Sequence, residues 1–232
     1  MNASGLSPLI KFGYENINHG LIYVFSERWQ NETSNFHLPV GEMIITLDDV
    51  ACLLDYPITG RLIEEEEISY EQGIQLLEEE LRFMKEEAMD EVKKQWGENV
   101  NYTKLKRCHE RLLNRCSQFE EPTSDEEEEE SHVRTACIKA FLLLLVGDNV
   151  FANKNSKSVS LVWLLAIQDI DRLGDWSWGG MTLTFLYSQL SLTSNANVKV
   201  VGGYMTLLNV IFFSYFLVDH KCIFVFMILV LI

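Results

Sequence analysis

Most of the chain carries apolar residues at helical spacing, with polar residues between them. This pattern predicts helices over residues 14–30 and 47–54, two within 64–96, and another over 102–119. It predicts further helices over 133–146, 160–173 and 177–190, and a last apolar helix after Gly202 and Gly203. The fold class that follows is mainly α, in the form of an irregular multi-helix domain.

One short stretch departs from this helical pattern. Pro39 and Gly41 break helical continuity, so the apolar residues on either side of them predict a β-hairpin near residues 35–46. The next helix has a defined start, because Thr46 can act as its N-cap and Asp49 stands three residues later, at the capping-box position.

The charge of the chain is concentrated in one region. The net charge is −15, and residues 60–131 hold 22 acidic against 10 basic residues, so this stretch alone carries −12. We interpret residues 62–119 as a helical acidic insert and residues 120–131, which include Pro122, as a disordered acidic linker. No basic patch indicates a nucleic-acid surface, whereas an acidic arm suits a basic partner.

The five cysteines are irregularly spaced, which favours reduced thiols in an intracellular protein over a disulfide framework. The C-terminal region is strongly apolar over residues 207–218 and 222–232, with only residues 219–221 polar between them. Central charges cost about 2.5–3.5 kcal/mol each on membrane insertion, which so many apolar neighbours can offset. Two interpretations stay open: a transmembrane helix near residues 208–231, or an aggregation-prone, misread tail.

A series of short blocks stands out along the chain. They are ERWQNET (27–33), FHLPVGEM (36–43), ITLDDVA (45–51), LLDYPITGR (53–61), AFLLLLVG (140–147), FA (151–152), DIDR (169–172), WSWG (176–179), LY (186–187) and GGYM (202–205). Their order and spacing resemble the plant mobile domain family over roughly residues 14–208. On this resemblance, residues 14–61 and 132–208 are the two parts of the domain, the second one truncated, and residues 209–232 are an atypical apolar tail.

The resemblance implies a helical domain of transposable elements and their domesticated relatives, some of which are fused to a phosphatase of the long-form type seven class. It implies nuclear proteins that act in transposon silencing and in genome and meristem maintenance. It implies no established catalytic residues.

The most site-like charged cluster contains Asp169, Asp171, Arg172 and Asp175. Such a group could serve a metal ion or a phosphate, but Asp169 and Asp171 would point about 200° apart on a helix, and further ligands are missing. Charge on a helix surface is therefore the preferred interpretation. Lys139 is the only lysine in a clearly buried segment and has no glycine-rich phosphate cradle, so a pyridoxal enzyme is not indicated. We expect no catalytic residue, no metal and no cofactor.

Two regions are expected to form an interaction surface, the block at 36–49 and the region at 176–178. His37 is interpreted as a hydrogen-bonded structural histidine, and packing between helices is favoured for the two tryptophans over stacking on a base or a peptide. The candidate residues are Phe36, His37, Glu42, Asp48, Asp49, Asp171, Arg172, Trp176 and Trp178.

The function expected from these observations is that of a non-catalytic, transposon-derived interaction module located in the nucleus. Its expected partners are proteins, with a phosphatase-like or chromatin-associated protein suggested by the resemblance. Two alternatives stay open: a nucleic-acid-binding transposase remnant, and a truncated product tethered to a membrane through residues 208–231.

Overall fold

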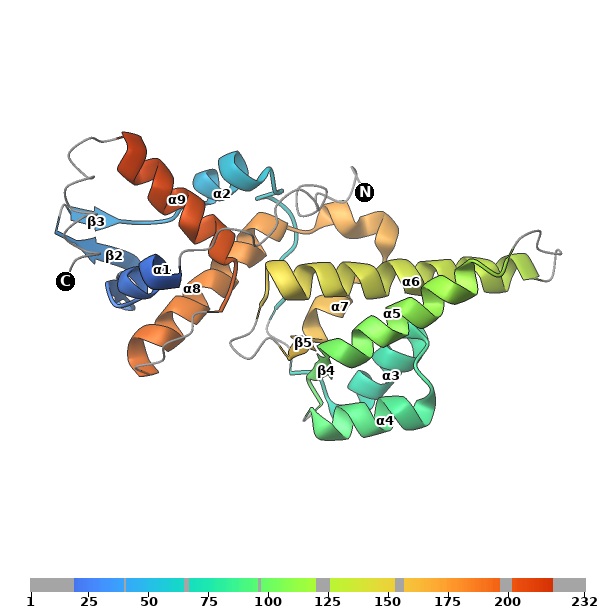
Figure 1. Cartoon of the computed structure of the whole chain (residues 1–232). Coiled ribbons are helices and arrows are strands. Elements are labelled where there is room, and N and C mark those ends of the chain that lie inside the picture. The colour runs from blue at the N-terminus through green and yellow to red at the C-terminus, as the bar shows by residue number, and fades with distance from the viewer. Residues whose placement is uncertain are drawn as a thin grey trace. The chain divides into compact units, whose positions relative to one another are not determined.

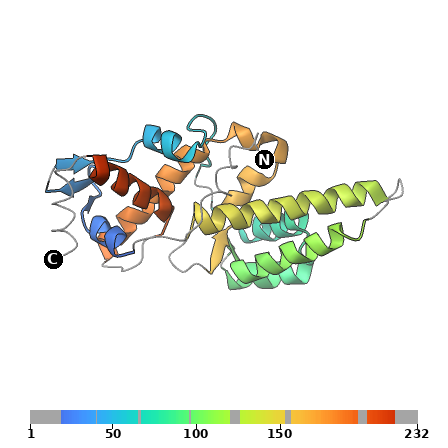
Figure 2. The ribbon, with the colours of Figure 1, turned by 45° about the horizontal axis from the view of Figure 1, so that its top comes forward.

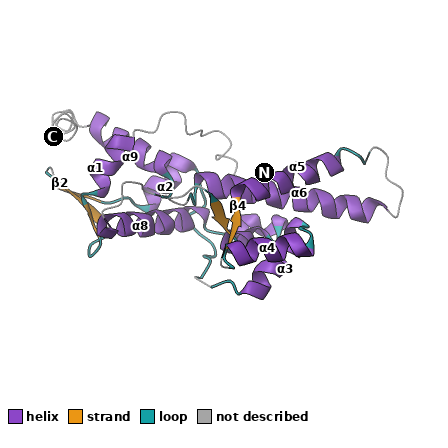
Figure 3. Cartoon of the chain, turned by 60° about the horizontal axis from the view of Figure 1, so that its bottom comes forward, coloured by secondary structure: helices purple, strands orange, loops and turns teal. Residues whose placement is uncertain are grey.

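The computed structural model describes residues 19–39, 41–64, 67–95, 97–119, 126–152, 157–196 and 202–218. The chain forms two compact units: unit 1 comprises residues 1–62 and 174–232, and unit 2 comprises residues 63–173 (Figure 1). In the residues that the structure describes, helices dominate both units and the strands form two small antiparallel sheets (Figure 3). The predicted fold class, mainly α with a short hairpin, is confirmed.

Unit 1 combines a three-stranded sheet with four helices. Its elements are α1 (His19–Ser26), β1 (Trp29–Gln30), β2 (Asn35–Leu38), β3 (Gly41–Met43), α2 (Leu47–Leu54), α8 (Trp178–Ala196) and α9 (Met205–Val218). Strands β2 and β3 form the predicted hairpin, with Phe36 opposite Met43. The helix predicted over 14–30 is shorter, because Trp29 leaves it and pairs in β1 with Phe36; residues 14–18 lie outside the described part.

The predicted capping box at the start of α2 is confirmed. The Thr46 hydroxyl accepts a hydrogen bond from the backbone N–H of Asp49 at 3.1 Å, and the Asp49 carboxylate accepts one from the backbone N–H of Thr46 at 2.8 Å. Each side chain thereby satisfies a donor that the helix itself leaves without a partner. The helix ends at Leu54, before Pro57, because Asp55 adopts a left-handed conformation.

Aromatic side chains from distant parts of the sequence form the core of unit 1. The rings of Phe25 and Phe212 stack with their centroids 3.6 Å apart, and Phe36 meets both of them edge-on. Ile211 and Phe212 on α9 are fully buried. The expectation that the chain becomes an atypical tail from residue 209 therefore does not hold for Ile211 and Phe212, which complete this core, whereas Val210 is 37% exposed.

No described helix is long and apolar enough to cross a membrane. The apolar residues 219–232, on which the prediction of a transmembrane helix also depends, lie outside the described residues.

Unit 2 is built around a long helical hairpin. Its elements are α3 (Tyr70–Leu81), α4 (Lys85–Lys94), β4 (Asn99–Asn101), α5 (Tyr102–Cys116), α6 (Glu126–Asn149), β5 (Ser158–Ser160) and α7 (Val162–Ile167), and the 3-10 helix η3 (Ile170–Asp175) follows. Helices α5 and α6 lie side by side (Figures 1 and 2). Strand β4 precedes this hairpin in the chain and β5 follows it. The two strands, which the sequence did not predict, pair antiparallel.

Two predicted helix boundaries in unit 2 are wrong. Helix α6 continues through Gly147 to Asn149, and a Cβ at Gly147 would lie 2.4 Å from a methyl group of Val159, so the glycine serves close packing of β5. The helix predicted over 160–173 is split, because α7 ends at Ile167 and the chain continues as η3.

The acidic linker predicted over 120–131 is helical from Glu126 onward, and residues 120–125 lie outside the described part.

The unit boundaries also differ from the predicted domains, because α6 and α7 fold together with the presumed acidic insert. One cause is an arginine pair: the guanidinium groups of Arg82 and Arg115 bind the Glu129 carboxylate at 2.7 and 2.8 Å. This pair provides counter-charges for the acidic start of α6.

A buried carboxylate connects α4 to α5. Glu91 is 1% exposed, and its side chain accepts a hydrogen bond from the backbone N–H of Asn101 at 2.6 Å and pairs with the Lys104 ammonium at 2.7 Å. Its neighbour Asp90 is exposed and binds Lys94 and Lys104 from the outside. The two adjacent acids therefore have different roles, one inside the unit and one on its surface.

Candidate interaction surface

The hairpin and the first turn of α2 present a mixed apolar and acidic surface on unit 1. His37 lies directly opposite Glu42 in the register of β2 and β3, and both side chains are exposed. Between the hairpin and α2, Ile44 is 49% exposed and Leu47 is 40% exposed, so two large aliphatic side chains lie three residues apart at the surface. We call these four residues, together with the exposed Asp48, the hairpin surface.

The hairpin surface is held in place from behind. The Tyr187 hydroxyl on α8 donates a hydrogen bond of 2.5 Å to the backbone carbonyl of Ile45, and burial raises the pKa of this phenol. The capping box fixes the next turn, so Asp49 is half-buried and occupied with its cap. Ile44 and Leu47 therefore project from a backbone that is fixed on both sides.

Phe36, expected at the surface, lies in the core. It is 0% exposed, and its ring meets Trp29 edge-on with centroids 4.9 Å apart. The reason is the two-residue alternation of a strand, which turns Phe36 and Leu38 inward and leaves His37 outside. The prediction that Phe36 takes part in an interaction surface is wrong.

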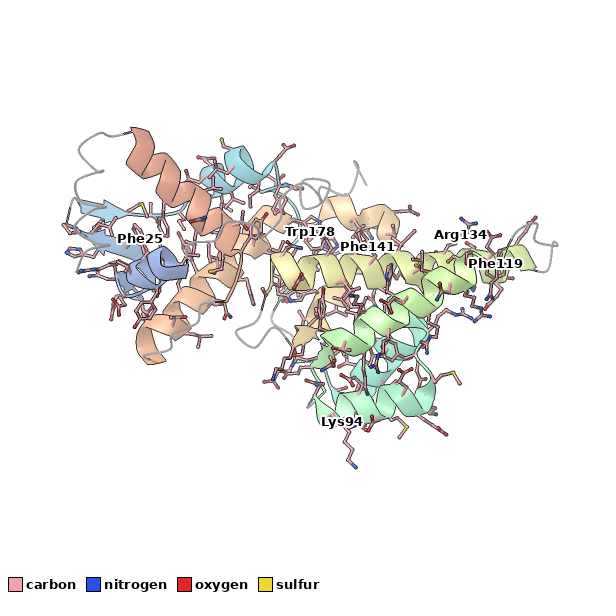
Figure 4. All side chains as sticks on the ribbon, in the orientation of Figure 1. Phe25, Lys94, Phe119, Arg134, Phe141 and Trp178 are labelled. Carbon is pink, nitrogen blue, oxygen red and sulfur yellow. The ribbon has the colours of Figure 1, made fainter. Side chains whose placement is uncertain are left out.

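The prediction that Trp178 lies on an interaction surface is also wrong, because this residue is 1% exposed at the start of α8 (Figure 4). The burial of this ring agrees with the interpretation favoured from the sequence, which is packing inside the fold and not stacking on a base or a peptide. Trp176 is half-buried, and the Arg61 guanidinium lies 4.5 Å from the centroid of its ring, in a cation–π contact.

This contact belongs to a junction where two of the sequence blocks meet. The backbone N–H of Arg61 donates to the Asp175 carbonyl at 2.8 Å, and the N–H of Ser177 donates to the Arg61 carbonyl at 2.8 Å. Gly60 has a φ of +123°, and a Cβ there would lie 2.5 Å from the Asp175 carbonyl oxygen. Residues 60–62 and 175–177, called the junction below, thus form one structural element at the point where the chain leaves unit 1 and returns to it.

The charged cluster of the sequence lies in and beside one short 3-10 helix. Asp169 precedes η3, and Asp171, Arg172 and Asp175 belong to it. Asp169 caps η3, because its carboxylate accepts a hydrogen bond from the backbone N–H of Asp171 at 3.2 Å. Asp169 therefore precedes η3, and the prediction that Asp169 and Asp171 lie on one helix is wrong. Among the described residues, no group of three or more His, Cys, Asp or Glu side chains could hold a metal ion.

Lys139, considered above for Schiff-base chemistry, forms an ion pair. Its ammonium lies 2.5 Å from one carboxylate oxygen of Glu80, and the other oxygen of Glu80 accepts a hydrogen bond from Gln168 at 3.3 Å. The lysine is 9% exposed. Its role in this arrangement is to join α6 to α3 and to the end of α7.

An arginine cluster in unit 2 was missed by the sequence analysis. Arg82, Arg111 and Arg115 line one groove together with the ring of Phe83, 5.9 Å from the Arg111 guanidinium. Glu129 binds two of these arginines, and Glu87 lies 3.3 Å from Arg111. The groove is therefore neutralised from within, and its arginines stabilise the packing of α3, α5 and α6. No signal in the sequence shows that these arginines converge.

The model of the plant mobile domain matches residues 5–221. The chain belongs to the plant mobile domain family. It is 30% identical to the protein MAINTENANCE OF MERISTEMS of Arabidopsis thaliana over 204 residues, which are 88% of this chain and 38% of that protein. It is 31% identical to the protein MAIN-LIKE 1 of the same plant over 219 residues, 94% of this chain and 40% of that protein.

A third relative is the serine/threonine-protein phosphatase 7 long form homolog of Arabidopsis thaliana, with 28% identity over 88% of this chain and 14% of that protein. The chain thus spans about two fifths of the length of MAINTENANCE OF MERISTEMS and MAIN-LIKE 1. No solved structure matches it. The plant mobile domain match extends past residue 208 to residue 221, in agreement with the burial of Ile211 and Phe212 on α9.

Proposed function

We propose that this plant mobile domain is a non-catalytic protein-interaction module and that the hairpin surface is its contact with partners. One observation carries the proposal: Ile44 and Leu47 are two large aliphatic side chains, 49% and 40% exposed, on a backbone fixed by hydrogen bonds. A fixed apolar patch with a polar rim suits a protein–protein contact, because little backbone entropy is lost on binding.

The partner that suits this surface is a protein segment with apolar side chains flanked by basic residues. Glu42 and Asp48 flank the two aliphatic residues, and the whole chain carries a net charge of −15. Complementary charge would speed the encounter and exclude acidic competitors. A phosphatase-like or chromatin-associated protein in the nucleus is the proposed source of such a segment.

The proposed process is meristem maintenance together with silencing of transposable elements. The name MAINTENANCE OF MERISTEMS of a relative supports the first part for this chain. The family resemblance described above motivates the second part and the nuclear location. The non-catalytic character is supported by Lys139 and Asp169, the groups considered for chemistry, because both hold structural contacts.

Binding of nucleic acid receives less support than binding of protein. A phosphate-binding surface needs cationic side chains without carboxylate partners, whereas Arg82, Arg111 and Arg115 each lie next to a glutamate. Net charge of −15 would further repel a polyanion.

The test is affinity capture from plant nuclei with the wild-type chain and with the double variant Ile44→Glu/Leu47→Glu. A control is Leu192→Glu, which places one such charge on a 54% exposed leucine of α8 in the same unit. We expect proteins captured by the wild type and by the control to be lost with the double variant, while far-UV circular dichroism stays unchanged. Capture of the same proteins by all three would refute the assignment of the surface. A fluorescent fusion that stays out of the nucleus would refute the proposed location.

A further inference from the structure

The solvent-facing side of α6 carries a regular pattern. Arg134, Ile138, Phe141, Leu145 and Asp148 follow one another at intervals of four, three, four and three residues. Ile138 is 45% exposed and Phe141 is 36% exposed, Leu145 is half-buried, and both end residues are exposed. We call these five residues the α6 stripe; Figure 4 shows Arg134 and Phe141 along the helix.

This spacing is that of the seam of a coiled coil. Alternating intervals of four and three residues keep side chains on one side of a helix, facing a second helix. The opposite side of α6 is already occupied, since Val133, Ala136 and Ala140 are buried in unit 2. In the part of the chain that the structure describes, the three apolar residues of the α6 stripe remain at least partly open to solvent.

The charges at the ends of the α6 stripe decide which helix can lie against it. Arg134 and Asp148 both stand seven residues from Phe141, on opposite sides. A second copy of α6 placed antiparallel, with Phe141 against Phe141, therefore brings Arg134 of each copy opposite Asp148 of the other. A parallel copy would set arginine against arginine and aspartate against aspartate. The pattern is complementary to itself in one direction only.

We propose that the α6 stripe is a contact between two copies of this chain, packed antiparallel about Phe141. The neighbouring helix α5 widens the contact: the ring of His109 lies 5.8 Å from that of Phe141, and Leu113, one turn further along α5, is 53% exposed. Two α5–α6 hairpins then form a four-helix arrangement, in which apolar residues of both hairpins are buried. This contact lies on unit 2 and goes beyond the proposed function, which uses unit 1.

The electrostatic surroundings of the two end residues agree with this contact. Burial raises the pKa of the Asp148 carboxyl, and a facing guanidinium offsets such a cost. Tyr102 on α5 also lies beside Asp148, because burial and then the charge of Asp148 raise the pKa of its phenol. The Nε of Arg134 donates to Glu130 at 2.6 Å, one turn earlier on α6, which holds the guanidinium along the helix. In the proposed dimer this guanidinium lies between Glu130 of its own chain and Asp148 of the other copy.

The contact should be weak, because the α6 stripe spans only two heptads. Sedimentation velocity of the whole chain, over a concentration series at physiological salt, measures it. At this ionic strength, charges more than about 8 Å apart are largely screened, which limits the general repulsion between two chains of net charge −15. We expect a reversible monomer–dimer equilibrium with micromolar dissociation constant.

Two variants make the test specific. Phe141→Glu places two carboxylates at the centre of the contact and should raise the dissociation constant about 30-fold or more, as loss of a central aromatic contact does. Met84→Glu places the same charge on a residue of unit 2 that is 69% exposed and outside the α6 stripe, and should leave the constant unchanged. A wild-type chain that is monomeric at all concentrations, or a dimer that Phe141→Glu leaves intact, would overturn the proposal.

The antiparallel direction is tested by reversing charges. Asp148→Arg alone should weaken the dimer, because it sets arginine against Arg134 of the other copy. The double variant Arg134→Asp/Asp148→Arg restores complementarity in the antiparallel dimer and should regain most of the affinity lost in the single variant. If the double variant stays as weak as the single one while circular dichroism shows an intact helix, the antiparallel pairing is wrong.

Discussion

The buried carboxylate of Glu91 offers a sharp test of how unit 2 is stabilised. Glu91→Ala removes the acceptor of the Asn101 N–H and the inner partner of Lys104. An unsatisfied buried N–H costs about 1–3 kcal/mol. Breaking a buried ion pair can cost about 3–5 kcal/mol, but the Lys104 side chain is 26% exposed and can turn to Asp90 and water, so the ionic part is much smaller. We expect a total loss of about 2–4 kcal/mol in the free energy of unfolding of unit 2.

Two further variants separate the parts of this effect. Glu91→Gln keeps an acceptor for Asn101 and removes only the charge, so it should cost roughly half as much as Glu91→Ala. Asp90→Asn changes the adjacent, exposed acid and should leave unfolding unchanged within error. Urea unfolding followed by circular dichroism measures the losses, and hydrogen exchange of α4 and α5 assigns them to unit 2, since two units need not unfold together. Equal losses for Asp90→Asn and Glu91→Ala would refute the reasoning.

The ion pair between Glu91 and Lys104 also predicts how the stability of unit 2 changes at alkaline pH. Burial lowers the pKa of Lys104, but the hydrogen bonds and charges of Glu91 and Asp90 outweigh it and raise the pKa above the ordinary 10.5. A group with a raised pKa in the folded state contributes stability that is complete below its unfolded pKa and is lost as the pH rises through the folded value. The difference in stability between wild type and Glu91→Ala should therefore be constant near neutral pH and shrink above about pH 10.5.

Three other predictions concern single residues. Gly60→Ala should destabilise unit 1 by roughly 2 kcal/mol or more, measured by thermal unfolding, because a left-handed φ and a backbone contact oppose a Cβ. Burial raises the pKa of the Cys108 and Cys137 thiols to about 11, so iodoacetamide at pH 8 should modify exposed Cys52 first, as mass spectrometry would show, and equal rates would contradict this. Thr46→Ala should cost about 1 kcal/mol of stability through loss of the α2 cap, whereas Thr46→Ser should cost little.

Features that depend on neighbouring residues could be predicted from the sequence. The capping box of Thr46 and Asp49 closes within one turn, and the hairpin follows from Pro39 and Gly41 between apolar residues. The alternation in β2 also places Phe36 and Leu38 on a common, apolar side of the strand. Their neighbour in the core, Phe212, could not be predicted, because it is far away in the sequence.

Features that depend on distant residues could not be predicted. The acidic start of α6 has the composition of a disordered linker, and the arginines at positions 82 and 115, which bind its Glu129, come from distant parts of the sequence. The pairing of Asn99 with Ser160 in β4 and β5 leaves no periodic trace, because each strand has three residues. The sequence blocks at 53–61 and 176–179 were both recognised, but their contact in the junction requires the fold of unit 1.

The junction has a consequence for the order in which the chain can fold during synthesis. Unit 2 is continuous in sequence, so all of it is synthesised before the second part of unit 1. The hairpin, α1 and α2 are synthesised first. Their apolar faces become buried only when α8 and α9 have been synthesised, because Phe212 on α9 packs against Phe25 and Phe36. The segment from α1 to Leu62 must therefore remain incompletely folded while a whole unit is synthesised after it. During that interval Phe25 and Phe36 are exposed to non-native contacts, which makes this segment the natural client of a chaperone.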